Sequence, residues 1–254
     1  MAELKFFYND TKTKVHDPSL PYSFRMLIVG SSGSGKTTLL MQLLLQENVL
    51  NYNKLYIFAR SLHQPEYQCL IEGFNNRLSK SDMIYLLNVG ADIESRNVSI
   101  RDVAEAMGNN NENPSDITAE FYNSSEDIPD PTELDTKVRN LMVFDDIMTD
   151  RRQTTAEQYY TRGRSCNCDS IYLSQNYIHL PLHTIRGNAN ILIFFKISPE
   201  EVDVLFRKFA SVDMTINEFR VVCKKAWSKK HGYLVIDPSR DFESGLKYRY
   251  DILI

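Results

Sequence analysis

A glycine- and serine-rich loop is the feature that most limits what this chain can fold into. It reads Gly30-Ser31-Ser32-Gly33-Ser34-Gly35-Lys36-Thr37 and matches the pattern GxxxxGK[ST] in full. An apolar run at 24–29 precedes it, and a segment rich in Leu and Gln, 36–47, follows it. In that context the glycines let backbone N–H groups wrap phosphate oxygens, and the helix that begins near Gly35 directs its positive end at the same anions. The pattern predicts a strand, a phosphate-binding loop and a helix, whereas a plain Gly/Ser linker would need no Lys-Thr at this spacing.

Two side chains of this loop are expected to take part in the chemistry. Lys36 reaches the β- and γ-phosphates in such loops, and the Thr37 hydroxyl holds magnesium. The predicted cofactors are therefore ATP and Mg²⁺. The predicted nucleotide-binding residues are Gly30, Ser31, Ser32, Gly33, Ser34, Gly35, Lys36, Thr37 and Thr38.

Apolar runs of strand length alternate with segments of helical pattern along the chain. Strands are predicted at 24–29, 54–59, 83–87, 141–144, 170–174, 191–197, 233–236 and 248–253. Helices are predicted at 36–47, 65–78, 151–160, 199–209 and 215–227. Such alternation favours an α/β fold with a mainly parallel central sheet flanked by helices, in which ligands bind at the carboxyl ends of the strands. We expect an N-terminal arm at 1–22 and a single P-loop ATPase domain at 23–254, with a polar loop or insertion at about 108–136.

Two adjacent acids follow the apolar run at 141–144. A strand that ends in Asp after a complete phosphate-binding loop is typical of the Walker B element, whose carboxylate accepts a water bound to magnesium. Asp145 is the predicted residue on the metal side. Asp146 is the predicted base that orients or deprotonates the attacking water, and its alternative role is a helix N-cap.

The next predicted strand, 170–174, ends at Gln175. An amide there can donate to the γ-phosphate and accept from the attacking water; the alternative is an ordinary residue of the turn after the strand. Between the phosphate-loop helix and the Asp145 strand we predict one strand of this type, Lys-Leu-Tyr-Ile-Phe-Ala at 54–59, followed by Arg60. That placement resembles the ASCE (RecA-like) branch of P-loop NTPases and disfavours the nucleotide-kinase and GTPase branch.

Composition narrows the class of protein. No apolar run reaches the roughly 20 residues that span a bilayer, and residues 1–10 lack the layout of a secretion signal, so we expect a soluble, intracellular protein with no membrane partner. The four cysteines form no CxxC pair, which disfavours a zinc site. Residues 81–150 carry 16 acidic and 4 basic residues, whereas 151–232 carry 13 basic and 7 acidic ones. This asymmetry suggests a polar assembly or an anionic partner.

The motifs together resemble the FtsK–HerA superfamily. Motors of that superfamily carry an Arg that is followed, after a short turn, by an apolar strand ending in Thr-Gln; here Thr161-Arg162-Gly163-Arg164 precedes Ser170-Ile-Tyr-Leu-Ser-Gln175. Within the superfamily the chain most resembles the poxvirus-type DNA-packaging ATPases of large DNA viruses, virophages and Maverick/Polinton-like elements. The likeness rests on Phe-Arg-Met-Leu-Ile-Val-Gly before the loop, Asp-Asp at Walker B, and Ser-Gln-Asn followed by Leu-Pro and Ile-Arg-Gly-Asn-Ala-Asn. Ser165 departs from the pattern, because many members have His there.

The resemblance implies a magnesium-dependent ATPase that works as a ring, usually hexameric, and drives double-stranded DNA into a capsid. The implied partners are double-stranded DNA, other copies of the chain, and a capsid or portal-vertex protein. The implied location is the host cell at viral assembly sites, or the virion. Arg164 is the implied arginine finger, directed at the γ-phosphate of a neighbouring subunit, with Arg162 as the second choice and a surface salt bridge as the structural alternative.

Two other functions compete with a packaging motor. One is a cellular-type FtsK–HerA translocase or helicase, which the lack of an appended membrane or barrel domain disfavours. The other is a P-loop NTPase that is no motor, which Arg164 and Gln175 disfavour.

A basic strip around Trp227 either contacts DNA phosphates or is a solvated helix face; it comprises Lys224, Lys225, Lys229, Lys230 and His231.

Overall fold

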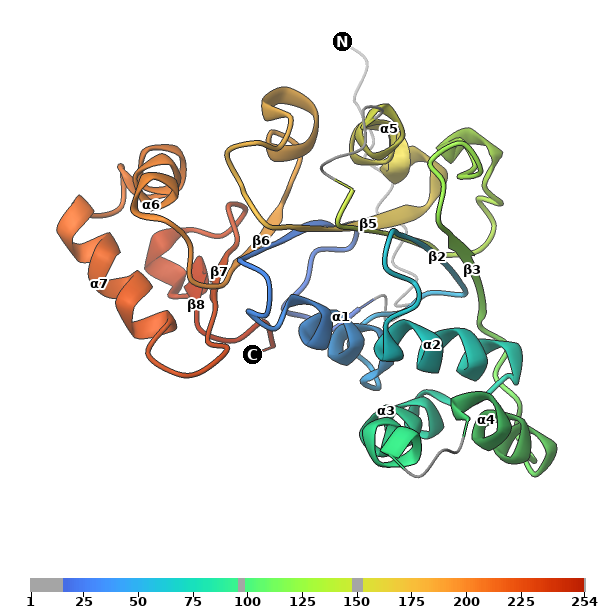
Figure 1. The fold of residues 1–254 in the computed structure, drawn as a ribbon. Coiled ribbons are helices and arrows are strands. Elements are labelled where there is room, and N and C mark those ends of the chain that lie inside the picture. The colour runs from blue at the N-terminus through green and yellow to red at the C-terminus, as the bar shows by residue number, and fades with distance from the viewer. Residues whose placement is uncertain (1–15, 96–98, 148–152, 254) are drawn as a thin grey trace, which may run out of the picture.

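An eight-stranded sheet organises the chain (Figure 1), in the order β3-β2-β4-β5-β1-β6-β7-β8. The computed structural model describes residues 16–95, 99–147 and 153–253. From β3 to β6 in this order, neighbouring strands are parallel; β7 is antiparallel to β6, and β8 is antiparallel to β7. The strands are β1 (Arg25–Val29), β2 (Lys54–Ala59), β3 (Thr118–Tyr122), β4 (Asn140–Asp145), β5 (Cys168–Ser174), β6 (Ile191–Phe194), β7 (Leu234–Ile236) and β8 (Tyr248–Arg249).

Helices cover both faces of this sheet. Figure 1 shows α1 and α2 on one face with α3 and α4 beyond them, α5 on the opposite face, and α6 and α7 beside the β6–β8 end. The helices are α1 (Lys36–Leu45), α2 (Pro65–Asn75), α3 (Lys80–Ser95), α4 (Ile100–Asn109), α5 (Thr154–Arg162), α6 (Pro199–Leu205) and α7 (Ile216–Ala226). The predicted mixed α/β fold with a mainly parallel central sheet is confirmed. No helix in the described ranges is both long enough and apolar enough to cross a membrane.

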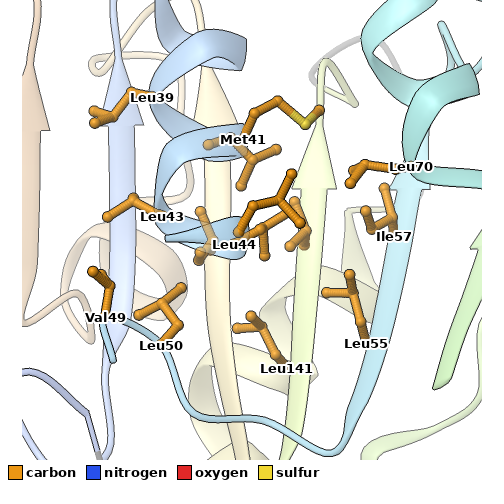
Figure 2. Close-up of a cluster of buried hydrophobic side chains, with 14 of the residues drawn as sticks. Leu39, Met41, Leu43, Leu44, Val49, Leu50, Leu55, Ile57, Leu70 and Leu141 are labelled. Atoms are coloured by element: carbon orange, nitrogen blue, oxygen red, sulfur yellow. The ribbon is translucent and has the colours of Figure 1, made fainter. Parts of the chain in front are cut away.

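Alternation along the strands builds two cores, one on each face. Leu55 and Ile57 of β2 face α1, whereas Tyr56 and Phe58 belong to the core on the α5 side. Figure 2 shows the first core, in which Leu44 of α1 packs toward β2 and Leu141 of β4. Successive side chains of a strand point to opposite faces, and a strand covered on both faces is apolar throughout. The uninterrupted apolar runs of the sequence therefore become the buried central strands.

The strand order assigns the branch of the P-loop fold. β5 lies between β1, which precedes the phosphate-binding loop, and β4, which ends in Asp145. A strand in this position is the mark of the ASCE type, so the predicted fold class is confirmed. Along the chain, β2 and β3 separate α1 from β4, and β3 lies in the segment that the sequence suggested was loop.

Two predictions of local structure are wrong. The expected strand at 83–87 is part of α3, where Met83 and Leu86 are buried at helical spacing. Ser79 fixes the start of this helix, since its hydroxyl accepts a hydrogen bond from the Asp82 backbone N–H at 3.1 Å. The polar segment 108–136 contains β3, an edge strand that pairs with β2 through Lys54 and Thr118. Its side chains are half-buried or exposed, so the apolar pattern of a strand is weak.

The other predicted elements are present with small shifts of their ends. The predicted helix at 199–209 is α6, continued by a π-helical turn at Phe206–Ala210. The predicted strand at 248–253 is limited to β8. Residues 151 and 152 of the predicted helix at 151–160 lie outside the described residues, as do 1–15 of the predicted arm.

Candidate active site

The phosphate-binding loop joins β1 to α1 and has the backbone that its glycines permit. Gly33 and Gly35 have φ of 72° and 107°, the left-handed region in which residues with a Cβ are strained. Lys36, the first residue of α1, folds back over the loop: its Nζ donates to the carbonyl oxygens of Gly30 at 2.7 Å and Ser31 at 2.9 Å. Burial lowers the pKa of Lys36, and the carboxylates of Asp145 and Asp146 oppose that effect. The two acids predicted from the sequence therefore favour the charged form of Lys36.

Asp145 is a buried carboxylate with a dedicated hydrogen-bond donor. It ends β4, only 9% of it is exposed, and its Oδ2 accepts a hydrogen bond of 2.5 Å from the Tyr67 hydroxyl on α2. Burial raises the pKa of Asp145, as does the neighbouring Asp146, whereas the Tyr67 hydroxyl and Lys36 lower it. An ionised carboxylate here needs partners, because desolvation without them is costly.

Asp146 and Gln175 meet across the carboxyl ends of β4 and β5. These strands are parallel neighbours, so the residues that follow them emerge at one edge of the sheet. Asp146 has φ of 52°, a conformation that Asp adopts more readily than most residues. Its Oδ1 accepts a hydrogen bond of 3.1 Å from Gln175 Nε2. Asp146 does not cap α5, whose N-cap is Gln153.

One cleft of about 290 Å³ collects these groups. It is lined by Ser32, Gly33, Gly35, Lys36, Thr37 and Thr38 of the loop, by Asp145, Asp146 and Gln175 of the strand ends, and by Ser61, Gln64, Glu66, Leu173, Ser174 and His231. A larger cavity of about 590 Å³ includes Tyr52 and Lys80 in its lining but none of the predicted site residues. The smaller cleft is the candidate active site, because the phosphate loop and the acids converge only there among the described cavities.

Three lining groups and one supporting residue escaped the sequence analysis. Ser61 and Gln64 come from the β2–α2 connection, Glu66 comes from the first turn of α2, and the supporting residue is Tyr67, which donates to Asp145. The Pro65-Glu66 start of a helix was visible in the sequence, but not that this start faces the cleft. His231 was considered only as part of the basic strip. Its Nδ1 lies 2.9 Å from the Ser34 carbonyl oxygen.

Arg164 lies at the amino ends of the strands, on the side of the sheet opposite the cleft of its own chain. It sits in the short 3-10 helix Gly163–Cys166, directly before β5 begins, and its side chain is exposed. β5 has 7 residues, which is about 20 Å of strand, more than an arginine side chain can span. Arg164 is close enough to Arg25, the first residue of β1, to lower the pKa of that guanidinium together with burial, which is the larger cause. Arg162 is also exposed, at the end of α5.

The basic strip divides into two parts in the structure. Lys224 and Lys225 lie in the last turn of α7, which ends at Ala226. Lys229 and Lys230 are exposed in the turn that follows, so the four lysines do not form one helix face. Trp227 fixes the junction, because its indole Nε1 donates to the Phe194 carbonyl at the end of β6 at 2.9 Å.

A family match supports the resemblance deduced from the motifs. Residues 14–101 match a family model described as Poxvirus A32 protein. The match includes the phosphate loop and ends before β4, and it confirms the predicted resemblance to poxvirus-type ATPases over that stretch. A search of curated protein sequences found no match.

Solved structures share the fold at low sequence identity. The genome packaging NTPase B204 of Sulfolobus turreted icosahedral virus 2, in complex with AMP, superposes with a TM-score of 0.52 at 12% identity, covering 92% of this chain and 100% of the other. The DNA-packaging ATPase B204 of Sulfolobus turreted icosahedral virus gives a TM-score of 0.50 at 12% identity, covering 90% of this chain and 97% of the other. The arrangement of strands and helices is therefore that of a P-loop ATPase.

Proposed function

We propose that this chain is an ATP-hydrolysing motor that packages viral double-stranded DNA into a capsid. The observation that carries the catalytic part is the convergence of Lys36, Asp145, Asp146 and Gln175 on one cleft. The packaging part is supported by the Poxvirus A32 family match over residues 14–101 and by the shared fold of the two B204 packaging ATPases.

The loop supplies the binding of the triphosphate. Its backbone N–H groups and the start of α1 favour anions, and Lys36 adds a point charge at the β- and γ-phosphates. Lys36 leaves its two carbonyl partners, Gly30 and Ser31, when the phosphates offer stronger, charged acceptors. Binding therefore exchanges hydrogen bonds with neutral carbonyl acceptors for hydrogen bonds with charged phosphate oxygens.

The oxygen groups of the cleft fit a magnesium ion. Mg²⁺ prefers oxygen ligands and is usually held by one or two carboxylates together with substrate phosphates. The Thr37 hydroxyl and the Asp145 carboxylate, which both line the cleft, are the residues that would hold it. When bound, magnesium neutralises charge on the β- and γ-phosphate oxygens.

Asp146 acts on the attacking water in this proposal. The Gln175 amide donates to one of its carboxylate oxygens, which fixes the orientation of the carboxylate and leaves the other oxygen available to accept a proton from water. Gln175 thereby positions Asp146 and, as a residue that lines the cleft, would contact the γ-phosphate when ATP binds.

Arg164 acts on the cleft of a neighbouring subunit. Arg164 lies about the length of β5 from the strand ends that carry its own cleft, which supports action on a neighbouring chain over action within one chain. A guanidinium stays charged and offers forked donors to phosphoryl oxygens. Hydrolysis would then require contact between subunits, as in a ring, and a hexamer is the count that the family resemblance suggests.

The partners follow from this assembly. Double-stranded DNA is the substrate that the motor translocates, and a capsid or portal-vertex protein is the partner to which the motor binds. The protein would act in the host cell at viral assembly sites or in the virion. The exposed Lys224, Lys225, Lys229 and Lys230 are candidates for contacts with DNA phosphates.

Steady-state ATP hydrolysis measured with and without DNA, together with the particle size, tests the proposal. A packaging motor should hydrolyse faster when double-stranded DNA is added, and the active species should elute as an oligomer. Single-stranded DNA of equal nucleotide content serves as the control. ATP hydrolysis that is indifferent to double-stranded DNA in a demonstrated oligomer would indicate a P-loop NTPase that is no DNA motor.

A further inference from the structure

His231 packs directly on the phosphate-binding loop from the far end of the chain. Its ring Nδ1 lies 2.9 Å from the Ser34 carbonyl oxygen, a contact across 197 residues of sequence. A Cβ placed on Gly35 would lie 3.2 Å from the same nitrogen, so the ring covers the Ser34–Gly35 peptide closely. A carbonyl oxygen can only accept, and Nδ1 must therefore carry a proton here, in the neutral ring or in the imidazolium.

This contact fixes the direction of the next backbone N–H. The Ser34–Gly35 peptide is trans, since the described residues contain no cis bond, and in a planar trans peptide the C=O and N–H point in opposite directions. His231 fixes the direction of the Ser34 carbonyl, so the Gly35 N–H is directed to the opposite side of the peptide. Gly35, at φ of 107°, has no Cβ to restrict rotation of this peptide.

The turn that presents His231 is itself firmly anchored. Trp227 donates from its indole to the Phe194 carbonyl at 2.9 Å, and the Gly232 N–H donates to the Lys229 carbonyl at 3.0 Å. A Cβ at Gly232 would collide with the Ala226 carbonyl, so the chain passes close to the end of α7. His231 has φ of 60°. These contacts fix the turn, so His231 can hold the Ser34–Gly35 peptide in place.

We propose that His231 is a positioning residue for nucleotide binding: it holds the Ser34–Gly35 peptide so that the Gly35 N–H faces the phosphates of the nucleotide. The inference rests on the proposed nucleotide site and adds to it a residue outside the motifs. Its role is to set the loop before the nucleotide arrives, which reduces the ordering that binding must otherwise provide.

Two substitutions at this position separate the hydrogen bond from the rest of the side chain. His231→Gly removes the ring and tolerates positive φ. His231→Asn keeps a donor, because Asn Nδ2 and His Nδ1 are both attached to Cγ, and Asn also adopts positive φ readily. His231→Ala is a second variant without a donor, in case the glycine loosens the turn.

The probe is a fluorescent ADP analogue, which is titrated into each variant in a buffer that contains magnesium. Steady-state ATP hydrolysis is measured for the same variants. The loss of one hydrogen bond should raise Kd about threefold to tenfold in the Gly and Ala variants, and the Asn variant should stay within about twofold of the wild type. The KM for ATP should rise by the same factor with kcat nearly unchanged, since the N–H binds ground state and transition state alike. A purely structural defect would instead lower kcat through a smaller active fraction.

The outcomes distinguish the inference from the proposed function. Equal nucleotide affinity in wild type, Gly and Ala variants would overturn the role of His231 while leaving the nucleotide site intact. An Asn variant as weak as the Gly variant would also overturn it, because the donor would not then matter. A wild-type protein that binds no nucleotide would refute the proposed function itself, and the inference with it.

Discussion

Replacing Tyr67 with phenylalanine tests how Asp145 is kept in the core. The Tyr67 side chain is fully buried, and its hydroxyl donates to the Asp145 carboxylate at 2.5 Å. Tyr67→Phe removes one oxygen and leaves the ring, so no large cavity forms. A hydrogen bond to a charged group contributes about 1.5–3 kcal/mol net, against about 0.5–1.5 kcal/mol for a neutral pair. We therefore expect the free energy of unfolding at pH 8 to fall by about 2 kcal/mol.

Urea unfolding with nucleotide and magnesium absent measures this cost. With a slope of about 3 kcal/mol/M, the midpoint should move down by about 0.7 M while the slope is unchanged. Tyr52→Phe is the matched control, because the buried Tyr52 hydroxyl donates to a neutral acceptor, the Leu44 carbonyl, at 2.9 Å. Its cost should be about 1 kcal/mol.

A double-mutant cycle with Asp145→Asn isolates the pair. In the Asp145→Asn background the acceptor is neutral, so removal of the Tyr67 hydroxyl should cost about as little as Tyr52→Phe, giving a coupling energy of about 1 kcal/mol. If Tyr67→Phe costs no more than the control, and no coupling appears, the argument that this hydroxyl stabilises a buried charge is refuted.

Three further predictions concern the chemistry and its partners. Asp146→Asn should retain nucleotide and magnesium binding but lose turnover, whereas Asp145→Asn should need more magnesium for half-maximal hydrolysis; identical defects in a magnesium titration would show that the division of roles is wrong. The Arg164→Ala variant should bind ATP normally and hydrolyse it poorly. Mixing it with the Lys36→Ala variant should give more ATP hydrolysis than the sum of the two separate variants. If rings shown to be mixed hydrolyse no more ATP than that sum, a finger in trans is excluded. Charge reversal of the four lysines of the basic strip should weaken DNA binding and flatten its salt dependence, and binding unchanged at low and moderate salt would indicate a plain solvated surface.

The parts of the site that depend on local sequence were predictable. The phosphate loop is one contiguous motif whose backbone conformation its own glycines permit, so a single short segment was enough to predict it. Asp145, Asp146 and Gln175 come from two segments, but they follow apolar strands, and the carboxyl ends of parallel strands meet at one edge. The hydrogen bond between Gln175 and Asp146 is the consequence.

Contacts between distant segments were not predictable in the same way. Tyr67 and Asp145 are 78 residues apart, and His231 and Ser34 are 197 apart. No periodicity marks Tyr67 as a neighbour of Asp145 or His231 as a neighbour of the loop, because their positions depend on how α2 and the turn before β7 pack. The same holds for β3, whose half-exposed side chains carry a weak pattern and whose structure comes from pairing with β2.

ATP hydrolysis by the wild type and by Lys36→Ala, in magnesium buffer, tests the central claim most directly. Lys36 donates to two backbone carbonyls of the loop, which it can exchange for phosphate oxygens, and the carboxylates of Asp145 and Asp146 favour its charged form. The account predicts magnesium-dependent turnover in the wild type, and in the variant loss of turnover with weakened ATP binding and unchanged folding. Full activity in the Lys36→Ala protein would contradict it.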